Sequence, residues 1–303
     1  MKNTPLVSII IPVYNDIERL KQCLAALEKQ TYPQDLYEII VVDNASDESI
    51  AEVVNEYHQA STICEAQPGS YAARNKGISI AKGEIFAFTD SDCIPASDWI
   101  ENGVTALKNN PDCIIGGKIK LFFRDPSRLT AVELYEDLTA FPQQIHIERD
   151  NFTTTANLFT YKAVFDKVGK FNHKLKSGGD REWCQLAYQQ SYDIKYAEKA
   201  IIFHPARHSF QKIYHRNLRV AGGKVDLYRE KHKNKNHVFK LKVINEVARN
   251  LLVIPRDVLL VAIKDNYSAF QKIKILSILF ALRWGLNSEK MRVMMGGKSH
   301  NYQ

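Results

Sequence analysis

Apolar runs alternate with helical patterns over the first ninety residues, and this alternation restricts the possible fold more than any other feature. The run at 6–13, LVSIIIPV, is rich in β-branched residues and is typical of a strand buried on both faces. Apolar residues then recur at spacings of three and four in 17–30, as on one face of a helix. Further strands are expected at 38–43, 61–66 and 84–90. The pattern predicts a Rossmann-like α/β fold with a mostly parallel sheet flanked by helices.

The remainder of the chain is less regular. Strands are expected at 112–123, 153–160 and 192–205, and helices at 128–140 and 181–190. Two segments that mix apolar and basic residues at helical spacing follow, at 238–263 and 270–286. We therefore expect one α/β domain at 1–211, which contains the strand ends discussed below, and a basic, mainly helical C-terminal extension at 212–303.

Polar residues end three of the expected strands, as Tyr14-Asn15, Asp43-Asn44 and Asp90-Ser91-Asp92. Ligands bind beyond the carboxyl ends of the strands in sheets of this type, so these residues should converge on one site. Two carboxylates separated by one residue at a strand end can hold a hard divalent cation, which in turn binds a diphosphate. Asp43 either forms a turn with the following residues or hydrogen-bonds a nucleotide, and the two roles are compatible.

Charge divides the chain into an acidic part and a basic part. Residues 212–303 contain 19 Lys or Arg and 6 Asp or Glu, whereas residues 1–211 contain 22 Lys or Arg and 28 Asp or Glu. An acidic body with a basic tail, including the tract KHKNKNH at 231–237, predicts two regions with different tasks.

Several features predict a cytoplasmic protein. No charged segment followed by a long apolar stretch begins the chain, so no signal peptide is expected. No uncharged apolar run reaches the length of about 18 residues expected of a membrane span. The cysteines are odd in number and include no CxxC pair, which predicts five small buried thiols in a reducing compartment rather than disulfides or a zinc site: Cys23, Cys64, Cys93, Cys113 and Cys184.

Five motifs together resemble the inverting glycosyltransferases of family 2, which have the A-type nucleotide-sugar transferase fold. They are PVYN at 12–15, DNASD at 43–47, GSYAARNKG at 69–77, TDSD at 89–92 and SGGDREW at 177–183. Their order and spacing match over about 1–210, and the last 90 or so residues lie outside the resemblance. The resemblance implies transfer of a sugar from a nucleotide-diphosphate sugar to an acceptor hydroxyl, by metal-assisted direct displacement with Mn²⁺ or Mg²⁺, in polysaccharide or glycoconjugate synthesis.

The resemblance also implies roles for individual residues. Pro12 and Tyr14 would frame the nucleotide base, and Asn15 would be a further donor-binding residue. Asp43 would hydrogen-bond the base, with Arg74 beside it. Asp90 would contact the ribose or the metal shell, and Asp92 would bind the cation. Direct displacement also requires a group that accepts the proton of the attacking hydroxyl, and a carboxylate suits that task.

The catalytic base is expected at Asp180, where the chain departs from the commoner pattern of the family. A Glu-Asp pair often occupies this position, but here Gly179 precedes Asp180, and Glu182 follows two residues later. On a helix these two carboxylates point in different directions, so only one should face the acceptor. We favour Asp180, and Glu182 remains the alternative.

His204 ends the strand expected at 192–205. It is either a structural residue or, as the resemblance implies, a contact to the diphosphate or a third metal ligand beside Asp90 and Asp92, since imidazole suits manganese. Arg207 and His208 follow as candidates to contact the phosphates.

The C-terminal helices allow two interpretations. Basic amphipathic helices can lie in a membrane surface, here near a saccharide or lipid-linked acceptor. Alternatively, they pack on the catalytic domain or on a second subunit. The sequence does not decide between them.

Three other functions compete with glycosyl transfer. A nucleotidyltransferase generally has a Gly-rich loop after the first strand, where this chain has Tyr14-Asn15-Asp16. A nucleic-acid-binding protein would use the basic tail, but would leave the acidic residues at the strand ends without a purpose. An inactive sugar-binding relative would not require the carboxylate at Asp180.

Overall fold

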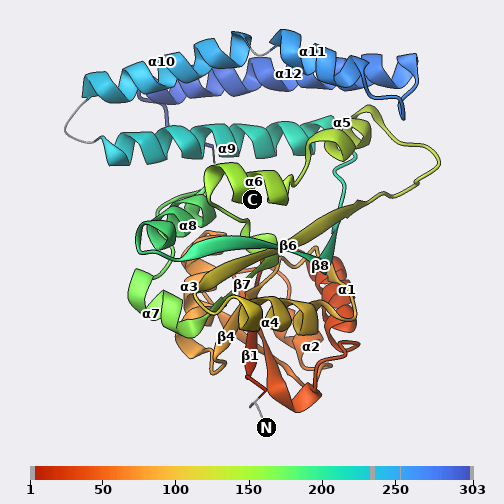
Figure 1. The fold of residues 1–303 in the computed structure, drawn as a ribbon, viewed down its shortest axis with the longest axis vertical. Helices are drawn as coiled ribbons and strands as arrows, with labels where there is room; N and C mark the ends of the chain where they lie inside the picture. The colour runs from red at the N-terminus through yellow and green to blue at the C-terminus, as the bar shows by residue number, and fades with distance from the viewer. Residues whose placement is uncertain (1–3, 233–235, 253, 301–303) are drawn as a thin grey trace. The chain divides into compact units, whose positions relative to one another are not determined.

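The computed structural model describes residues 4–232, 236–252 and 254–300 (Figure 1). Parts of the basic tract at 231–237 and of the segment at 238–263 therefore lie outside the described residues. The chain divides into two compact units. Unit 1 comprises residues 1–121, 141–174 and 179–205, and unit 2 comprises residues 122–140, 175–178 and 206–303. The domain boundary expected between 211 and 212 remains a prediction.

An eight-stranded sheet has the strand order β3-β2-β1-β4-β7-β6-β8-β5. Its strands are β1 (Val7–Val13), β2 (Tyr37–Asp43), β3 (Ala60–Cys64), β4 (Ile85–Phe88), β5 (Ile94–Pro95), β6 (Cys113–Phe122), β7 (Leu158–Tyr161) and β8 (Asp193–Pro205).

The sheet is mixed. Strand β1 pairs in parallel with β2 and β4, and β2 pairs in parallel with β3. Strand β7 runs antiparallel to β4 and β6, and β5 runs antiparallel to β8. The predicted α/β class is confirmed, and the predicted parallel order holds for the first four strands. Two helices rather than one separate β6 from β7 and β7 from β8, so the strand–helix–strand rule does not fix the direction of these later strands.

Helices of unit 1 cover both faces of the sheet. Ile9 and Ile11 of β1 belong to one buried cluster with Leu24 of α1, whereas Ile10 belongs to a second cluster with Trp183 of α8. Successive residues of β1 thus face opposite cores, which explains its uninterrupted apolar run. These helices are α1 (Ile17–Leu27), α2 (Ile50–Val54), α3 (Ser70–Ile80), α4 (Trp99–Asn109), α6 (Gln143–Asp150), α7 (Lys162–Val168) and α8 (Gly179–Gln189), with 3-10 turns at Gln34–Leu36 and Thr155–Asn157.

Unit 2 is helical, as expected for the C-terminal residues. It contains α5 (Ala131–Thr139), α9 (Phe210–Lys231), α10 (Asn236–Leu252), α11 (Ile254–Ala262) and α12 (Ala269–Met294). Helix α12 packs against α5 and α9, and α10 packs against α9 and α12. Val225 of α9, Phe239 and Val243 of α10, and Val293 of α12 form one of its buried clusters. Within the described part of the chain, no helix has the length and apolarity needed to cross a membrane.

The cysteines are free thiols, as predicted, but not all of them are buried. Cys23, Cys93, Cys113 and Cys184 are buried, whereas Cys64 is exposed. The prediction of five buried thiols is therefore wrong for Cys64. This residue ends β3, the edge strand of the sheet, where one side of the strand has no neighbour.

Candidate active site

The loops after β1 and β2 meet at one edge of the sheet. Val13 of β1 pairs with Asp43, the last residue of β2. The Asn15 side chain donates to Asp47 (2.8 Å) and accepts from the backbone N–H of Asp47 (2.8 Å), and the Asn15 N–H donates to Ser46 Oγ (3.0 Å). Asp43 Oδ1 accepts a hydrogen bond from the Ser46 N–H (2.9 Å), so Asp43 does form the turn that the sequence allowed. Three of the residues expected at the nucleotide site lie near Asp43 at this edge of the sheet: Pro12, Tyr14 and Asn15.

Two side chains of helix α3 bind two of the predicted site carboxylates, Asp90 and Asp180. The buried Arg74 guanidinium forms an ion pair with Asp90, which follows β4. The Tyr71 hydroxyl donates to Asp180 Oδ1 at 3.2 Å. Tyr71 and Arg74 are three residues apart and therefore lie on one face of the helix, with the guanidinium carbon 5.8 Å from the Tyr71 ring centroid. Asp90 and Asp180, ninety residues apart in the sequence, are thereby held along the same face of α3.

A close approach to the sheet fixes the position of α3. A Cβ atom added at Gly77 would lie 2.6 Å from a methyl carbon of Ile10 in β1. Real Cβ atoms do not approach other atoms so closely, so only glycine permits this packing. Gly77, the last residue of the GSYAARNKG motif, thus allows α3, with Tyr71 and Arg74, to pack close to the sheet.

The Tyr71 ring leaves no room for a side chain at position 179, which is a glycine. A Cβ atom there would lie 2.8–2.9 Å from three atoms of the ring. The ring is buried beside Phe171, with ring centroids 5.8 Å apart. Burial raises the pKa of the Tyr71 hydroxyl well above its usual range, and the negative charge of Asp180 raises it further. The hydroxyl therefore remains a proton donor to the carboxylate at neutral pH.

Glu182 lies on a different face of α8 from Asp180. The two residues are two positions apart, which places them about 200° apart around the helix axis. Of these two carboxylates, Asp180 is the one that the structure brings to Tyr71 of α3.

Asp92 and His204 form the centre of a group of potential metal ligands. Asp92 Oδ1 lies 3.7 Å from His204 Nε2, and the ligand atoms of Asp92, Cys93 and His204 all lie within 4.8 Å of one another. Arg19 Nη1 lies 3.4 Å from Asp92 Oδ2. Asp90, the third predicted metal ligand, lies outside this group and pairs with Arg74.

The donor chemistry of this group fits a divalent cation. His204 Nδ1 lies 2.8 Å from the Pro205 carbonyl oxygen, which can only accept, so Nδ1 carries a proton. Nε2 is then the atom that faces the Asp92 carboxylate, and in the neutral imidazole its lone pair is available to a cation held between the two side chains. Burial, and then the charges of Asp92 and Asp90, raise the pKa of the Cys93 thiol well above its usual range, so Cys93 is the weakest ligand of the group.

Arg207 belongs to unit 2, where Glu136 of α5 binds it. Its Nη1 atom lies 2.8 Å from Glu136 Oε1, and its backbone N–H donates to the other carboxylate oxygen. The buried Glu136 carboxylate thus fixes the direction of the Arg207 guanidinium. Its predicted contact with phosphate remains a prediction.

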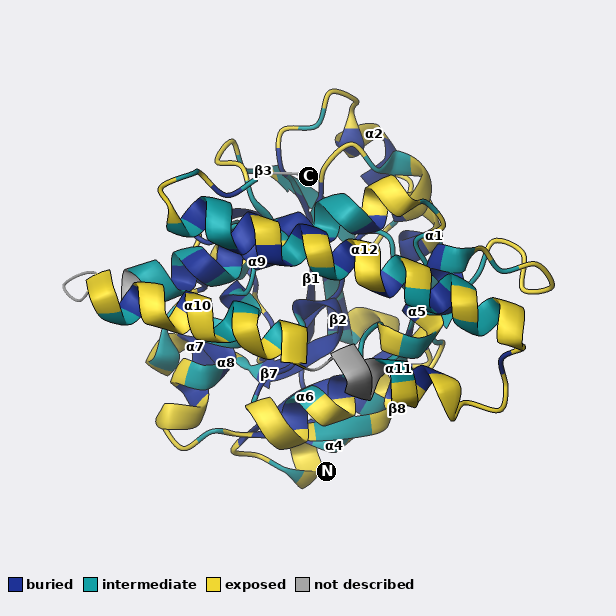
Figure 2. Cartoon of the chain, turned by 90° about the horizontal axis from the view of Figure 1, so that it is seen from above, coloured by how far each residue is buried: buried dark blue, intermediate teal, exposed yellow. Residues whose placement is uncertain are grey.

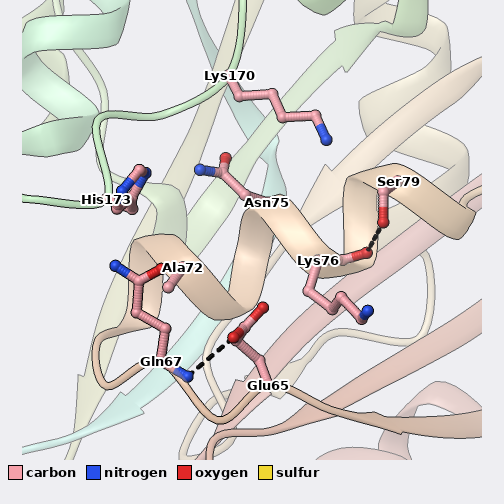
Figure 3. A pocket seen from close by; sticks show the side chains of 8 residues that line it. All are labelled: Glu65, Gln67, Ala72, Asn75, Lys76, Ser79, Lys170 and His173. Carbon is pink, nitrogen blue, oxygen red and sulfur yellow. Dashed lines mark hydrogen bonds between the residues drawn. The ribbon is translucent and has the colours of Figure 1, made fainter.

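A separate polar groove of about 190 Å³ runs along another face of α3 (Figure 3). Asn75 holds the neighbouring loop there, since its side chain donates to the Phe171 carbonyl (2.8 Å) and accepts from the Phe171 N–H (3.0 Å). None of the predicted donor, metal or base residues lines it. The lining residues are Glu65, Gln67, Ala72, Asn75, Lys76, Ser79, Lys170 and His173.

The mixed α/β sheet has polar residues at the ends of its parallel strands and the Asp92–His204 pair close by, as in α/β proteins that bind a ligand beyond the carboxyl ends of the strands. The sequence profile described as glycosyl transferase family 2 matches residues 8–171. The chain belongs to this family and is a glycosyltransferase.

Individual relatives agree with this assignment. Glycosyltransferase AglE of Haloferax volcanii is 38% identical over 229 residues, which cover 74% of each chain. The mannosyltransferase PcManGT of Pyrobaculum calidifontis, solved with GDP-Man and Mn²⁺, has a TM-score of 0.60 at 16% identity and covers 98% of this chain and 77% of its own. TarS 1-349 of S. aureus has a TM-score of 0.55 at 16% identity, with 96% and 92% covered. These two structures confirm the predicted A-type fold.

Two residues of the site were not anticipated from the sequence. Tyr71 lies within a recognised motif, and its position three residues before Arg74 on one helix was the available signal. Arg19 approaches Asp92 from α1, some seventy residues away, and no sequence pattern connects the two.

Proposed function

We propose that this chain is an inverting glycosyltransferase that transfers a sugar from a nucleoside diphosphate donor to an acceptor hydroxyl in a single displacement. The observation that carries the proposal is the linkage through α3, which holds Asp180 and Asp90 on one face of the same helix. A base and a donor-binding carboxylate must be near each other if acceptor and donor are to react.

The donor would bind at the ends of β1, β2 and β4. Asp43 and the Pro12–Asn15 turn are adjacent in the sheet and suit a base and ribose, because each offers hydrogen-bonding groups beside an exposed aromatic ring, Tyr14. Arg74 would contribute positive charge near the diphosphate, directed by its ion pair with Asp90. Arg207 would make a further phosphate contact.

Asp92 and His204 would hold a divalent cation, with Asp90 in its outer shell. Carboxylate oxygen and imidazole nitrogen suit Mn²⁺, and carboxylate and water suit Mg²⁺. When bound, the cation supplies charge neutralisation for the departing diphosphate. The 3.7 Å approach of the two ligand atoms supports this assignment.

Asp180 would accept the proton of the acceptor hydroxyl. Its Oδ1 atom accepts a hydrogen bond from the Tyr71 hydroxyl. This bond would orient the carboxylate and leave Oδ2 to accept the proton of the acceptor. Tyr71 is a positioning residue in this scheme, because it acts on the substrate only through Asp180. Glu182 lies on a different face of α8 from Asp180. It would therefore not point toward the same acceptor, which disfavours it as the base.

The acceptor would be a saccharide or a lipid-linked hydroxyl, in polysaccharide or glycoconjugate synthesis. We retain the division into a catalytic region at 1–211 and a basic extension at 212–303 as two parts with different tasks. The charge asymmetry between the two ranges supports this division.

A donor screen tests the proposal. Nucleotide release from a panel of nucleotide sugars, with Mn²⁺ or Mg²⁺ and candidate acceptors, identifies the active pair. With that pair, Asp180→Asn should abolish transfer, whereas Glu182→Gln should retain most of it. If Asp180→Asn keeps near-normal turnover and Glu182→Gln loses it, the base is Glu182.

A further inference from the structure

Helix α12 exposes a stripe of mainly apolar residues, which also includes Ser277. Ile273, Phe280 and Trp284 are 64%, 42% and 78% exposed, and their spacing keeps them on one face of the helix. The other side of α12 is apolar as well, since Ile275 and Leu282 are buried. Large apolar side chains that gather exposed on one helix face mark a surface that binds another molecule.

Helix α10 exposes a second stripe of the same kind. Leu241, Ile244 and Leu251 are 56%, 45% and 52% exposed and follow one another at helical spacing. The buried side of α10 is formed by Phe239 and Val243, which pack in the cluster shared with α9 and α12.

The two stripes lie on the same side of unit 2. Helices α10 and α12 contact each other through Asn250, whose side chain donates to Asn287 (3.0 Å) and whose carbonyl accepts from Arg283 (2.9 Å). Both helices also pack against α9, so their exposed stripes face away from it. Figure 2 shows exposed residues recurring along α10 and α12. We call the surface formed by Leu241, Ile244, Leu251, Ile273, Phe280 and Trp284 the apolar face.

Basic residues accompany the apolar face. Residues 236–288 contain eight Lys or Arg and three Asp or Glu. Lys240 and Arg249 are exposed on α10, and Lys264 is exposed in the segment between α11 and α12. Apolar and aromatic side chains surrounded by lysine and arginine suit the boundary between hydrocarbon and anionic headgroups. A second copy of this chain would bring the same positive charges together, which disfavours it as the occupant.

We propose that the apolar face binds the surface of an anionic lipid bilayer, with α10 and α12 lying in the plane of the membrane. The aromatic and aliphatic side chains enter the acyl boundary, and the basic residues contact the headgroups. The inference does not depend on the residues assigned to catalysis. Loss of vesicle binding would therefore contradict only this inference, and absence of sugar transfer would contradict only the proposed function.

Vesicle co-sedimentation of the full chain tests the proposal. Binding should be strong to vesicles of phosphatidylcholine with phosphatidylglycerol and weak to phosphatidylcholine alone. The triple variant Ile273→Ser, Phe280→Ser, Trp284→Ser should bind at least tenfold more weakly. Neutralising Lys240, Arg249 and Lys264 should weaken binding by up to about fivefold for each charge, which corresponds to about 1 kcal/mol per basic residue at an anionic surface.

A matched control is available in unit 1, where Ile145, Leu186 and Tyr188 are 49%, 44% and 45% exposed. Their triple replacement by serine removes a similar set of exposed apolar residues and should leave vesicle binding unchanged. Circular dichroism of every variant verifies that it is folded.

Tryptophan fluorescence provides a second readout. Trp99 and Trp183 are at most 1% exposed, whereas Trp284 is 78% exposed, so a blue shift on addition of anionic vesicles reports Trp284. Trp284→Phe should keep the binding and lose the shift.

Three results would overturn the proposal. The first is the absence of binding to anionic vesicles, and the second is equal binding by the wild type and the apolar-face variant. The third is a dimer in analytical ultracentrifugation that the apolar-face variant abolishes, without vesicle binding. That result would assign the face to a second copy of the chain.

Discussion

Replacing Gly179 with alanine tests the packing that aligns Asp180 with Tyr71. The added Cβ atom would lie 2.8–2.9 Å from three atoms of the Tyr71 ring. The ring is only 6% exposed and packs beside Phe171, so it has little room to withdraw. The methyl group must therefore displace the start of α8, the ring, or both.

The size of the effect follows from this overlap. Forcing an extra carbon into a packed interior costs about 1–3 kcal/mol. Because 1 kcal/mol shifts the Tm of a domain of 150–250 residues by about 2–4 °C, we expect the Tm to fall by roughly 2–12 °C. A shift of a few tenths of an ångström at Asp180 should lower kcat about tenfold, given that a displacement of about 1 Å can cost about 100-fold. The donor KM should change little, because the donor residues lie on other elements.

The measurement is thermal unfolding together with nucleotide release, with Gly179→Ala introduced into three backgrounds. Tyr71→Phe keeps the ring, so the added methyl should cost as much stability there as in the wild type. Tyr71→Ala removes the ring, so the cost should fall by about 1 kcal/mol or more, as expected for residues in direct contact. An equal cost in all three backgrounds would refute the steric explanation.

Three further predictions concern charge. Arg74→Met should weaken nucleoside diphosphate binding about tenfold, because it removes a charged hydrogen-bond donor near the donor site; an unchanged Kd in calorimetry would show that Arg74 does not reach the ligand. Glu246→Gln should lower the free energy of unfolding by about 2 kcal/mol at pH 7, because it leaves the buried Lys290 ammonium without its carboxylate. Burial tends to raise the pKa of Glu246, but the hydrogen bonds from its lysine partners outweigh this effect and lower the pKa below its usual value. A carboxylate with a lowered pKa stabilises the folded state above its unfolded pKa of 4.5 and ceases to do so as the pH falls through the folded value. The difference in Tm between wild type and Glu246→Gln should therefore stay constant from pH 7 to about pH 5 and shrink as the pH falls below 4.5, and a difference that does not shrink there would contradict the ion pair. Cys93→Ala should keep metal-dependent nucleotide binding within about threefold, because burial raises the pKa of its thiol and so disfavours the thiolate that would bind a metal, whereas a tenfold loss would make Cys93 a ligand.

The first half of the fold was predictable because its signals are local. Strand β1 is apolar on both faces, and α1 follows with a clear periodicity, so their order predicts the parallel half of the sheet. The direction of β7 depends on pairing with β4 and β6, which lie far from it in the sequence. The exposure of Cys64 likewise depends on β3 being at the edge of the sheet.

The site was predictable where a residue ends a strand, and not where it acts across elements. Asp43 ends β2, and Asp90 and Asp92 come shortly after β4, so their convergence could be inferred. The bond between Tyr71 and Asp180 joins two helices that are 109 residues apart in the sequence. The glycine at 179 departs from the family pattern, and its reason becomes visible only with the Tyr71 ring against it.

Asp92 and Asp180 are assigned different tasks at one site, and calorimetry can separate these tasks. The measurement is binding of the active nucleoside diphosphate, with and without Mn²⁺, to the wild type, Asp92→Ala and Asp180→Asn. We predict that Asp92→Ala weakens the Mn²⁺-dependent binding at least about tenfold, as expected on loss of a metal ligand. Asp180→Asn should bind normally and yet fail to transfer sugar. Equal affinities for all three proteins, or a loss of binding in Asp180→Asn alone, would contradict this division of roles.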